Sequence, residues 1–141
     1  MMDATDQPLA SEPPAQLSKI PIAQLSPTLD QLEHKCIYAA VTLVWPYSSS
    51  TKSLSLLLAE PDFRLRRSNG QVKVTFHGRV AERVAESAVG IGDEVRLALK
   101  YSRLVSNDAA QQTPGRFVAW DAYFDNGVSL EVSRVPRETT K

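Results

Sequence analysis

The sequence predicts an all-β domain, folded as one small five-stranded barrel with a short helix between the third and fourth strands. Three observations support this prediction. Segments rich in Val, Leu, Thr and aromatic residues recur along the chain, and turn residues bound them. A run with helical spacing of apolar residues lies between the third and fourth of these segments. The 141 residues are 43% hydrophobic, enough for one modest core.

The first three strands are expected at Cys36–Trp45, Ser53–Ala59 and Gln71–Phe76. Each of these segments favours β structure through its branched and aromatic side chains. Asn69-Gly70 is typical of a tight reversal and leads the chain into the third strand.

After the third strand, apolar residues recur at a spacing of three and four, which predicts a short helix at Arg79–Ala88 that ends at Gly90. Strict alternation of apolar and polar residues then predicts a fourth strand at Glu94–Lys100 with one buried face. A fifth strand is expected at Phe117–Phe124, and a sixth segment at Val128–Val132.

The remaining segments complete the predicted organisation. Residues 1–19 are polar and proline-containing, so we expect a disordered tail. A serine cap followed by proline predicts a two-turn helix over residues 27–34. Residues 102–115 are expected to form a long mobile loop, within a domain that spans residues 20–135. The end, residues 136–141, is expected to be frayed.

Three strands, a short helix and then further strands follow the order of the five-stranded OB-fold barrel. Long predicted loops also fall where that fold has its ligand-facing loops, between strands one and two and between strands four and five. A generic small sandwich is the structural alternative.

The charge distribution favours an anionic partner. The formal net charge is zero, but residues 1–35 carry five acids and two lysines, a net charge of −3. Between Lys52 and Arg79, six basic and two acidic residues give a local charge of +4. The single cysteine, Cys36, allows no intrachain disulfide and favours a reducing compartment such as the cytosol or nucleus.

No motif predicts an enzyme. His34 and His77 lie far apart in the sequence, and only Cys36 could serve as a soft ligand beside them, so we expect no metal site. Gly90-Ile-Gly92-Asp93 lacks the third glycine and following helix of a nucleotide loop, and is interpreted as a helix stop. No serine–histidine–acid arrangement has motif support, and no cofactor is expected. No apolar run approaches the ~20 residues of a membrane-spanning helix.

Aromatic, hydroxyl and basic side chains instead gather where the first strand ends. This combination suits a phosphate-bearing chain with exposed bases better than a small-molecule pocket. The aromatic side chains either cap the barrel end or stack on bases, and the sequence leaves both interpretations open. The candidates in this segment are Trp45, Tyr47, Ser48, Thr51 and Lys52.

The third strand offers two alternative faces for a ligand. Phe76 is in phase with two valines, while Lys73, Thr75 and His77 form the opposite face. If the valines point inward, Phe76 belongs to the core and His77 faces the ligand. A bulge in the strand would reverse this assignment.

The second loop, residues 60–70, holds three arginines within four positions. They either contact phosphate or form a solvated loop, and the candidates are Arg64, Arg66 and Arg67.

Four blocks of the sequence resemble a known family. VTLVWPYSSSTKSLSLLLAEPDFRLRR, GQVKVTFHG, IGDEVRLAL and TPGRFVAWDAYFDNGVSLEV resemble the first OB domain of fungal protection-of-telomeres proteins, in the telomere-end-binding family. The resemblance runs from Ile20 to Val132. Members of this family continue into a second OB domain, whereas this chain covers one.

The resemblance implies binding of the single-stranded, G-rich 3′ overhang of telomeric DNA in the nucleus, at chromosome ends, beside other telomere-complex proteins. It implies neither a membrane partner nor a small-molecule substrate. The loop after the fourth strand also contributes to DNA binding in the family. By resemblance, the DNA contacts fall on Trp45, Tyr47, Thr51, Lys52 and Phe76, with Tyr101 and Arg103 near the start of that loop.

A different class of function is the alternative: an OB module that scaffolds a telomere complex through protein contacts, without touching DNA. A DNA-binding groove should expose basic and aromatic groups, whereas a docking module should expose an apolar patch with a polar rim. An anticodon-binding OB appendage is a third interpretation, but no synthetase domain is attached to support it.

Overall fold

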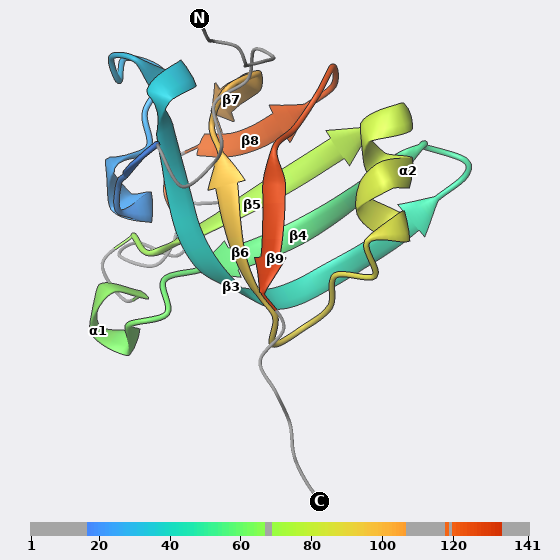
Figure 1. Cartoon of the computed structure of the whole chain (residues 1–141), viewed down its shortest axis with the longest axis horizontal. Coiled ribbons are helices and arrows are strands. Elements are labelled where there is room, and N and C mark those ends of the chain that lie inside the picture. Colours follow the sequence, from blue (N-terminus) through green and yellow to red (C-terminus); the bar gives the residue numbers. More distant parts are fainter. Residues whose placement is uncertain (1–16, 67–68, 107–117, 119, 134–141) are drawn as a thin grey trace, which may run out of the picture.

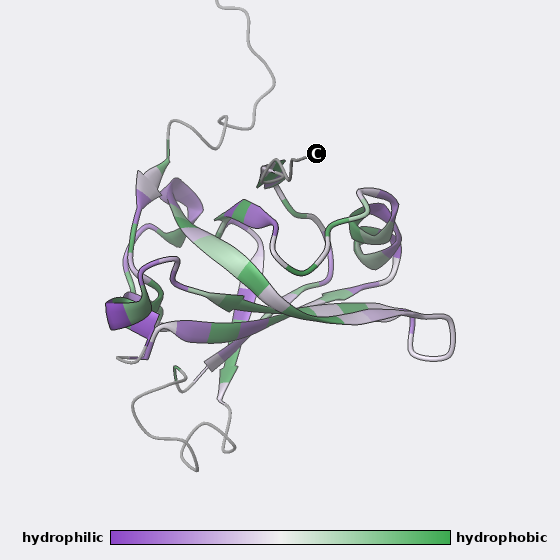
Figure 2. Cartoon of the chain, turned by 90° about the horizontal axis from the view of Figure 1, so that it is seen from below, coloured by the Kyte–Doolittle hydropathy of each residue, from purple (hydrophilic) through white to green (hydrophobic). Residues whose placement is uncertain are grey.

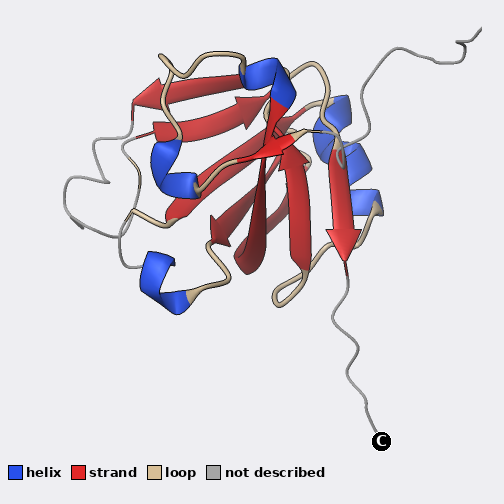
Figure 3. Cartoon of the chain, turned by 60° about the vertical axis from the view of Figure 1, so that its left-hand side comes forward, coloured by secondary structure: helices blue, strands red, loops and turns tan. Residues whose placement is uncertain are grey.

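A computed structural model of the chain describes residues 17–66, 69–106, 118 and 120–133. These residues form one strongly curved sheet with short helices at its rim (Figure 1; Figure 3). The predictions for residues 1–16, Arg67, residues 107–117 and residues 136–141 lie outside the described residues.

The sheet has eight strands in the order β7-β8-β5-β4-β3-β6-β9, and β2 pairs with β3 beside this path. The strands are β2 (Ser18–Lys19), β3 (Lys35–Ser48), β4 (Ser53–Ala59), β5 (Gln71–His77), β6 (Glu94–Ala98), β7 (Ser102–Ser106), β8 (Trp120–Phe124) and β9 (Leu130–Ser133). The helices are the 3₁₀ turns η2 (Ile22–Gln24) and η3 (Leu32–His34), and the α-helices α1 (Phe63–Arg66) and α2 (Arg79–Glu86).

The all-β class is confirmed, but the five-stranded closed barrel is wrong. The predicted fourth strand stops at Ala98, and Tyr101 has a positive φ of 73°, which breaks the extended backbone. The chain then resumes as β7, which pairs with β8 rather than with β3. Among the described residues, the hydrogen-bonded order therefore runs from β7 to β9 without closing, because no ladder joins these two strands.

The first three predicted strands are confirmed. β4 has the predicted bounds, β5 extends one residue further to His77, and β3 runs on to Ser48. The antiparallel ladder of β4 with β5 is continuous from Ser53 opposite His77 to Ala59 opposite Gln71. β8 then adds in parallel to the other edge of β5.

Two helix predictions need correction. Residues 27–34 form no α-helix, because Gln31 adopts the left-handed conformation (φ 58°, ψ 42°) and leaves only the 3₁₀ turn η3. α2 forms where predicted, but it ends at Glu86 rather than at Ala88. The sequence predicted that Gly90 ends the helix. Instead, Ala88 adopts the left-handed conformation (φ 58°) just after the helix end.

Two predicted irregular segments contain strands. Ser18–Lys19, expected to be disordered, pair in parallel with Lys35 and Cys36. Ser102–Ser106, expected to be part of a mobile loop, form β7 and pair with β8 from Ser102 opposite Phe124 to Ser106 opposite Trp120. Neither strand has an apolar pattern of its own, so its partner decides its conformation.

The core lies inside the curved sheet, and both α2 and the segment around η2 pack against it. In Figure 2 the strands change between green and purple along their length, in keeping with side chains that alternate between core and surface. Strand β5 buries Val72, Val74 and Phe76, and α2 covers the same core with Val80 and Val84.

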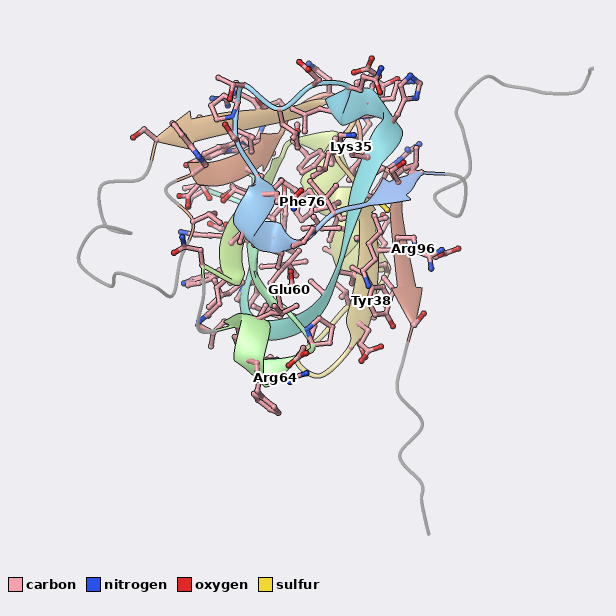
Figure 4. The ribbon with its side chains drawn as sticks, turned by 90° about the vertical axis from the view of Figure 1, so that its left-hand side faces the viewer. Lys35, Tyr38, Glu60, Arg64, Phe76 and Arg96 are labelled. Carbon is pink, nitrogen blue, oxygen red and sulfur yellow. The ribbon has the colours of Figure 1, made fainter. Side chains whose placement is uncertain are left out.

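Phe76 is a core residue, which corrects the prediction that it contacts DNA. Its side chain is 0% exposed and stacks on Phe124, with ring centroids 5.5 Å apart. Figure 4 shows Phe76 inside the molecule, whereas Arg64 in α1 lies at the rim. Because the β4–β5 ladder contains no bulge, strict alternation holds in this strand.

The bulge lies in β3 instead. Its register with β4 shifts between Val41 and Leu43, and again between Trp45 and Ser48. Val41 is buried before the first shift, whereas Leu43 and Trp45 are exposed after it. Beyond the second shift Tyr47 packs against the core, so Tyr47 and Trp45 do not form a pair of exposed rings.

We predict that Phe76→Ala lowers the free energy of unfolding by ~3–5 kcal/mol, because truncation leaves a cavity beside Phe124. The matched control is Phe63→Ala, which removes the same atoms from a side chain that is 72% exposed. Urea unfolding followed by circular dichroism measures both variants. Equal losses in the two would contradict the assignment of Phe76 to the core.

Candidate nucleic-acid interface

Five residues form a row across five neighbouring strands. Trp45 of β3 lies opposite Ser55 of β4, which lies opposite Thr75 of β5. Thr75 lies opposite Tyr123 of β8, which lies opposite Arg103 of β7. Directly opposed residues share one face of a sheet, so all five side chains lie on the outer face. We call this set the outer row.

An aromatic side chain and a lysine meet at the β3 end of the outer row. Lys73 Nζ lies 4.7 Å from the centroid of the Trp45 ring, within the range of a cation–π contact. Trp45 is 43% exposed, so much of its surface remains accessible to a ligand. Leu43, also exposed, lies in the neighbouring row with Leu57 and Lys73.

A second cluster forms around Tyr123. The His77 ring stacks on Tyr123 with centroids 5.9 Å apart and planes 7° from parallel. The Arg103 guanidinium carbon lies 4.9 Å from the centroid of the same ring. Asp125 joins the two: its Oδ1 accepts a hydrogen bond from His77 Nδ1 at 2.7 Å, and its Oδ2 accepts one from Arg103 Nη2 at 2.9 Å.

The pKa of Asp125 is lowered by these contacts. The hydrogen bond from Arg103 is the main cause, and the hydrogen bond from His77 adds to it, while partial burial opposes both. The carboxylate thus stays ionised and holds two cationic or hydrogen-bond-donating groups at the end of the outer row.

The two hydroxyl groups in the centre of the row are already paired. Ser55 Oγ and Thr75 Oγ1 are 2.9 Å apart, and both residues are buried. Thr75 lies on the face of β5 that the sequence predicted for ligand contact. Because it is buried and paired with Ser55, it holds the row together rather than contacting a ligand. Lys73 and His77 are the more exposed members of that face.

The first loop is tied to the start of α2. Lys52 has a positive φ of 54°, and its N–H donates to the Ser48 carbonyl at 2.7 Å. The Lys52 carbonyl accepts a hydrogen bond from the Gly78 N–H at 2.7 Å. Thr51 Oγ1 lies 2.8 Å from Ser53 Oγ. The loop hydroxyls therefore satisfy one another at the end of β4 that adjoins His77.

The arginines of α1 lie at the end of β4 and β5 opposite to the first loop. Each of these strands has seven residues, so the two ends are about 20 Å apart. The Arg64 side chain is 91% exposed and pairs with Asp62 at 3.3 Å. Arg66 Nε donates to the Glu60 carbonyl at 3.0 Å. The structure therefore does not bring these residues beside the first loop, and Arg67 lies outside the described residues.

Tyr101 directly precedes β7 and does not belong to the outer row. Its exposed ring is covered on one side by Lys100, whose Nζ lies 5.1 Å from the ring centroid. It lines a hollow together with Arg83 of α2 and Val128, which precedes β9. Of the predicted candidates, the structure gathers Trp45, Lys73, Thr75, His77 and Arg103 on one face.

Sequence reasoning missed Tyr123 and Asp125. The alternation that places Trp120, Ala122 and Phe124 against the core also turns Tyr123 outward. The sequence shows this alternation, but it does not show that the strand pairs with β5 and β7.

Among the described residues, no group of three or more His, Cys, Asp or Glu side chains could hold a metal ion. Within the same part of the chain, no helix has the length and apolar character needed to cross a membrane.

Residues 15–141 match the family described as "Domain of unknown function (DUF8502)". The chain belongs to this family. No curated protein matches the sequence of this DUF8502 domain.

The fold of the DUF8502 domain is shared with solved structures from fission yeast. "Crystal Structure of Schizosaccharomyces pombe Pot1pC bound to ssDNA (CGGTTACGGT)" is 15% identical, with a TM-score of 0.54, over 82% of this chain and 86% of that chain. "Crystal structure of fission yeast Pot1 and ssDNA" is 14% identical, with a TM-score of 0.55, over 82% of this chain and 39% of that chain. The likeness confirms an OB-like fold of the Pot1 type. The assignment to the first OB domain stays a prediction.

We predict that Asp125→Asn lowers stability at neutral pH and has no effect in acid. The lowered pKa means that Asp125 contributes stability above the unfolded-state pKa of ~3.9, and that this contribution is lost as the pH falls through the folded-state pKa. Because the side chain is 37% exposed, the contribution is at most about 1 kcal/mol.

Urea unfolding of both proteins from pH 7 down to acid measures this difference. Added salt should reduce it, since the pairs are partly solvated. A difference that stays constant down to the acid limit would show that the carboxylate charge is not its source.

Proposed function

We propose that this domain binds single-stranded DNA across the outer face of β3, β4, β5, β8 and β7, and that it does so without catalysing a reaction. The observation that carries the proposal is the outer row, in which aromatic, hydroxyl and basic groups follow one another across five strands. At ~4.8 Å between neighbouring strands, the row is about 19 Å long, enough for several nucleotides.

The two ends of the row have different roles in this proposal. Trp45 offers the more accessible ring and stacks on a base, while Lys73 beside it contacts phosphate. At the other end the Tyr123 ring is already in contact with His77 and Arg103. There His77 and Arg103 meet the strand, and Tyr123 holds them in place.

The groups on this face favour nucleic acid over a docked protein. A protein-docking surface would present a contiguous apolar patch with a polar rim. Here Leu43 is an exposed aliphatic residue beside the row, but Leu57 opposite it is only 7% exposed, and Lys73 follows in the same register. The scaffold alternative therefore does not suit the outer row.

We further propose that the strand is G-rich telomeric DNA, bound in the nucleus at chromosome ends together with other telomere-complex proteins. Two observations support this finer proposal. The sequence blocks resemble fungal protection-of-telomeres proteins, and the fold is similar to that of Pot1pC, whose structure contains single-stranded DNA.

We predict that Trp45→Ala weakens binding of a G-rich single strand by ~1–3 kcal/mol, a factor of roughly 5–150. The matched control is Phe63→Ala, which removes another exposed ring, in α1 and away from the row. Titration with fluorescently labelled DNA measures both variants, and the complementary strand and the duplex test strand preference. Unchanged affinity of the Trp45 variant would remove stacking from the proposal.

We predict that Lys73→Ala and Arg103→Ala each reduce the slope of log K against log salt by ~0.7, since each removes one phosphate contact. Arg64→Ala tests whether the strand extends to α1, as the sequence suggested. Affinities at several salt concentrations give the slopes. If only the Arg64 variant changes the slope, the strand lies along the α1 end of the sheet and not across the outer row.

A further inference from the structure

One edge of β9 is unpaired among the described residues. β9 pairs with β6, from Leu130 opposite Leu97 to Ser133 opposite Glu94, and it ends the strand order. Its other edge faces α2 (Figure 1). An unpaired edge presents backbone N–H and C=O groups to any extended segment that approaches it.

Beside this edge lies a hollow of about 150 Å³ between the strand and the helix. A second hollow of about 320 Å³ adjoins it, since Arg83 and Val128 line both. We call the two together the β9–α2 groove. Its narrower part is lined by Arg83, Val84, Ser87, Val128, Leu130 and Val132.

The groove has an apolar floor. Val128, Leu130 and Val132 belong to the partly buried side chains that pack against the core, so they retain exposed surface toward the hollow. Val84 of α2 forms the opposite wall. Side chains at every second residue of an extended segment can fill such a floor.

The rim of the groove is basic. Two cations, Arg83 and Lys100, lie along it, against one carboxylate, Glu33. Glu33 Oε2 lies 3.9 Å from His34 Nε2. Arg83 forms no ion pair with any residue in the described part of the chain. The charge of the rim therefore suits carboxylates.

We propose that the β9–α2 groove docks an extended segment of a partner protein in which apolar and acidic side chains alternate. The segment adds to the free edge of β9 through backbone hydrogen bonds. Its apolar side chains enter the hollow, and its carboxylates meet Arg83 and Lys100. None of the groove residues belongs to the outer row, so the proposal does not rest on DNA binding.

The probe is a short synthetic peptide that alternates valine with glutamate, and its control alternates valine with lysine. Amide chemical shifts of the ¹⁵N-labelled full chain report the site even for weak binding. The valine–glutamate peptide should shift the amides of β9 and of the last turn of α2. It should leave Trp45 and Tyr123 unchanged.

Two charge reversals on the same helix provide a matched pair. Arg83→Glu should weaken binding of the valine–glutamate peptide about fivefold. Arg79→Glu makes the same change at an exposed position outside the groove, and it should leave the affinity unchanged. The amide spectrum of each variant shows whether it is folded.

Several results would overturn the proposal. These are no shift at millimolar peptide, equal binding of the valine–lysine peptide, or equal loss of binding in both reversals. Shifts of the groove amides by single-stranded DNA would make nucleic acid the occupant. Binding that appears only after residues 1–16 are deleted would make the chain's own acidic segment the occupant.

Discussion

The register shift in β3 is the constraint on which the remaining architecture depends. β3 pairs with β6 over Cys36–Ala40 and with β4 from Ala40 onward, so the strand passes from one ladder to another at a single alanine. The shift just beyond that point reverses which side chains face the core. Without it, Trp45 would share the inward face of Ile37 and Val41. With it, Trp45 faces outward and meets Lys73 across β4.

The sequence predicted those elements whose local pattern and tertiary environment agree. β4, β5 and α2 lie close to their expected bounds, because each has an apolar face that matches its own period. Prediction from the sequence failed where a distant partner strand or a single backbone angle decides the structure. β7 lacks an apolar pattern and exists through its ladder with β8, and the helix expected over residues 27–34 is broken at Gln31.

The candidate site was predictable in part, for the same reasons. Lys73 and His77 were identified because β5 keeps strict alternation, whereas the orientation of Trp45 depends on a bulge that no residue pattern announces. Phe76 was placed at the site by resemblance, and its burial against Phe124 corrects that placement. Tyr123 joins the row through the parallel register of β5 with β8, which pairs residues 48 positions apart in sequence.

The break at Tyr101 connects the two surfaces of the domain. Before it, β6 lies between β3 and β9, and so supports the edge that faces α2. After it, β7 pairs with β8 and contributes Arg103 to the outer row. The Tyr101 ring itself lines the groove beside Val128. The positive φ of Tyr101 thus separates β6, which supports the β9–α2 groove, from β7, which contributes to the outer row. Because the two surfaces share this joint but no side chain, a substitution in one can leave the other intact.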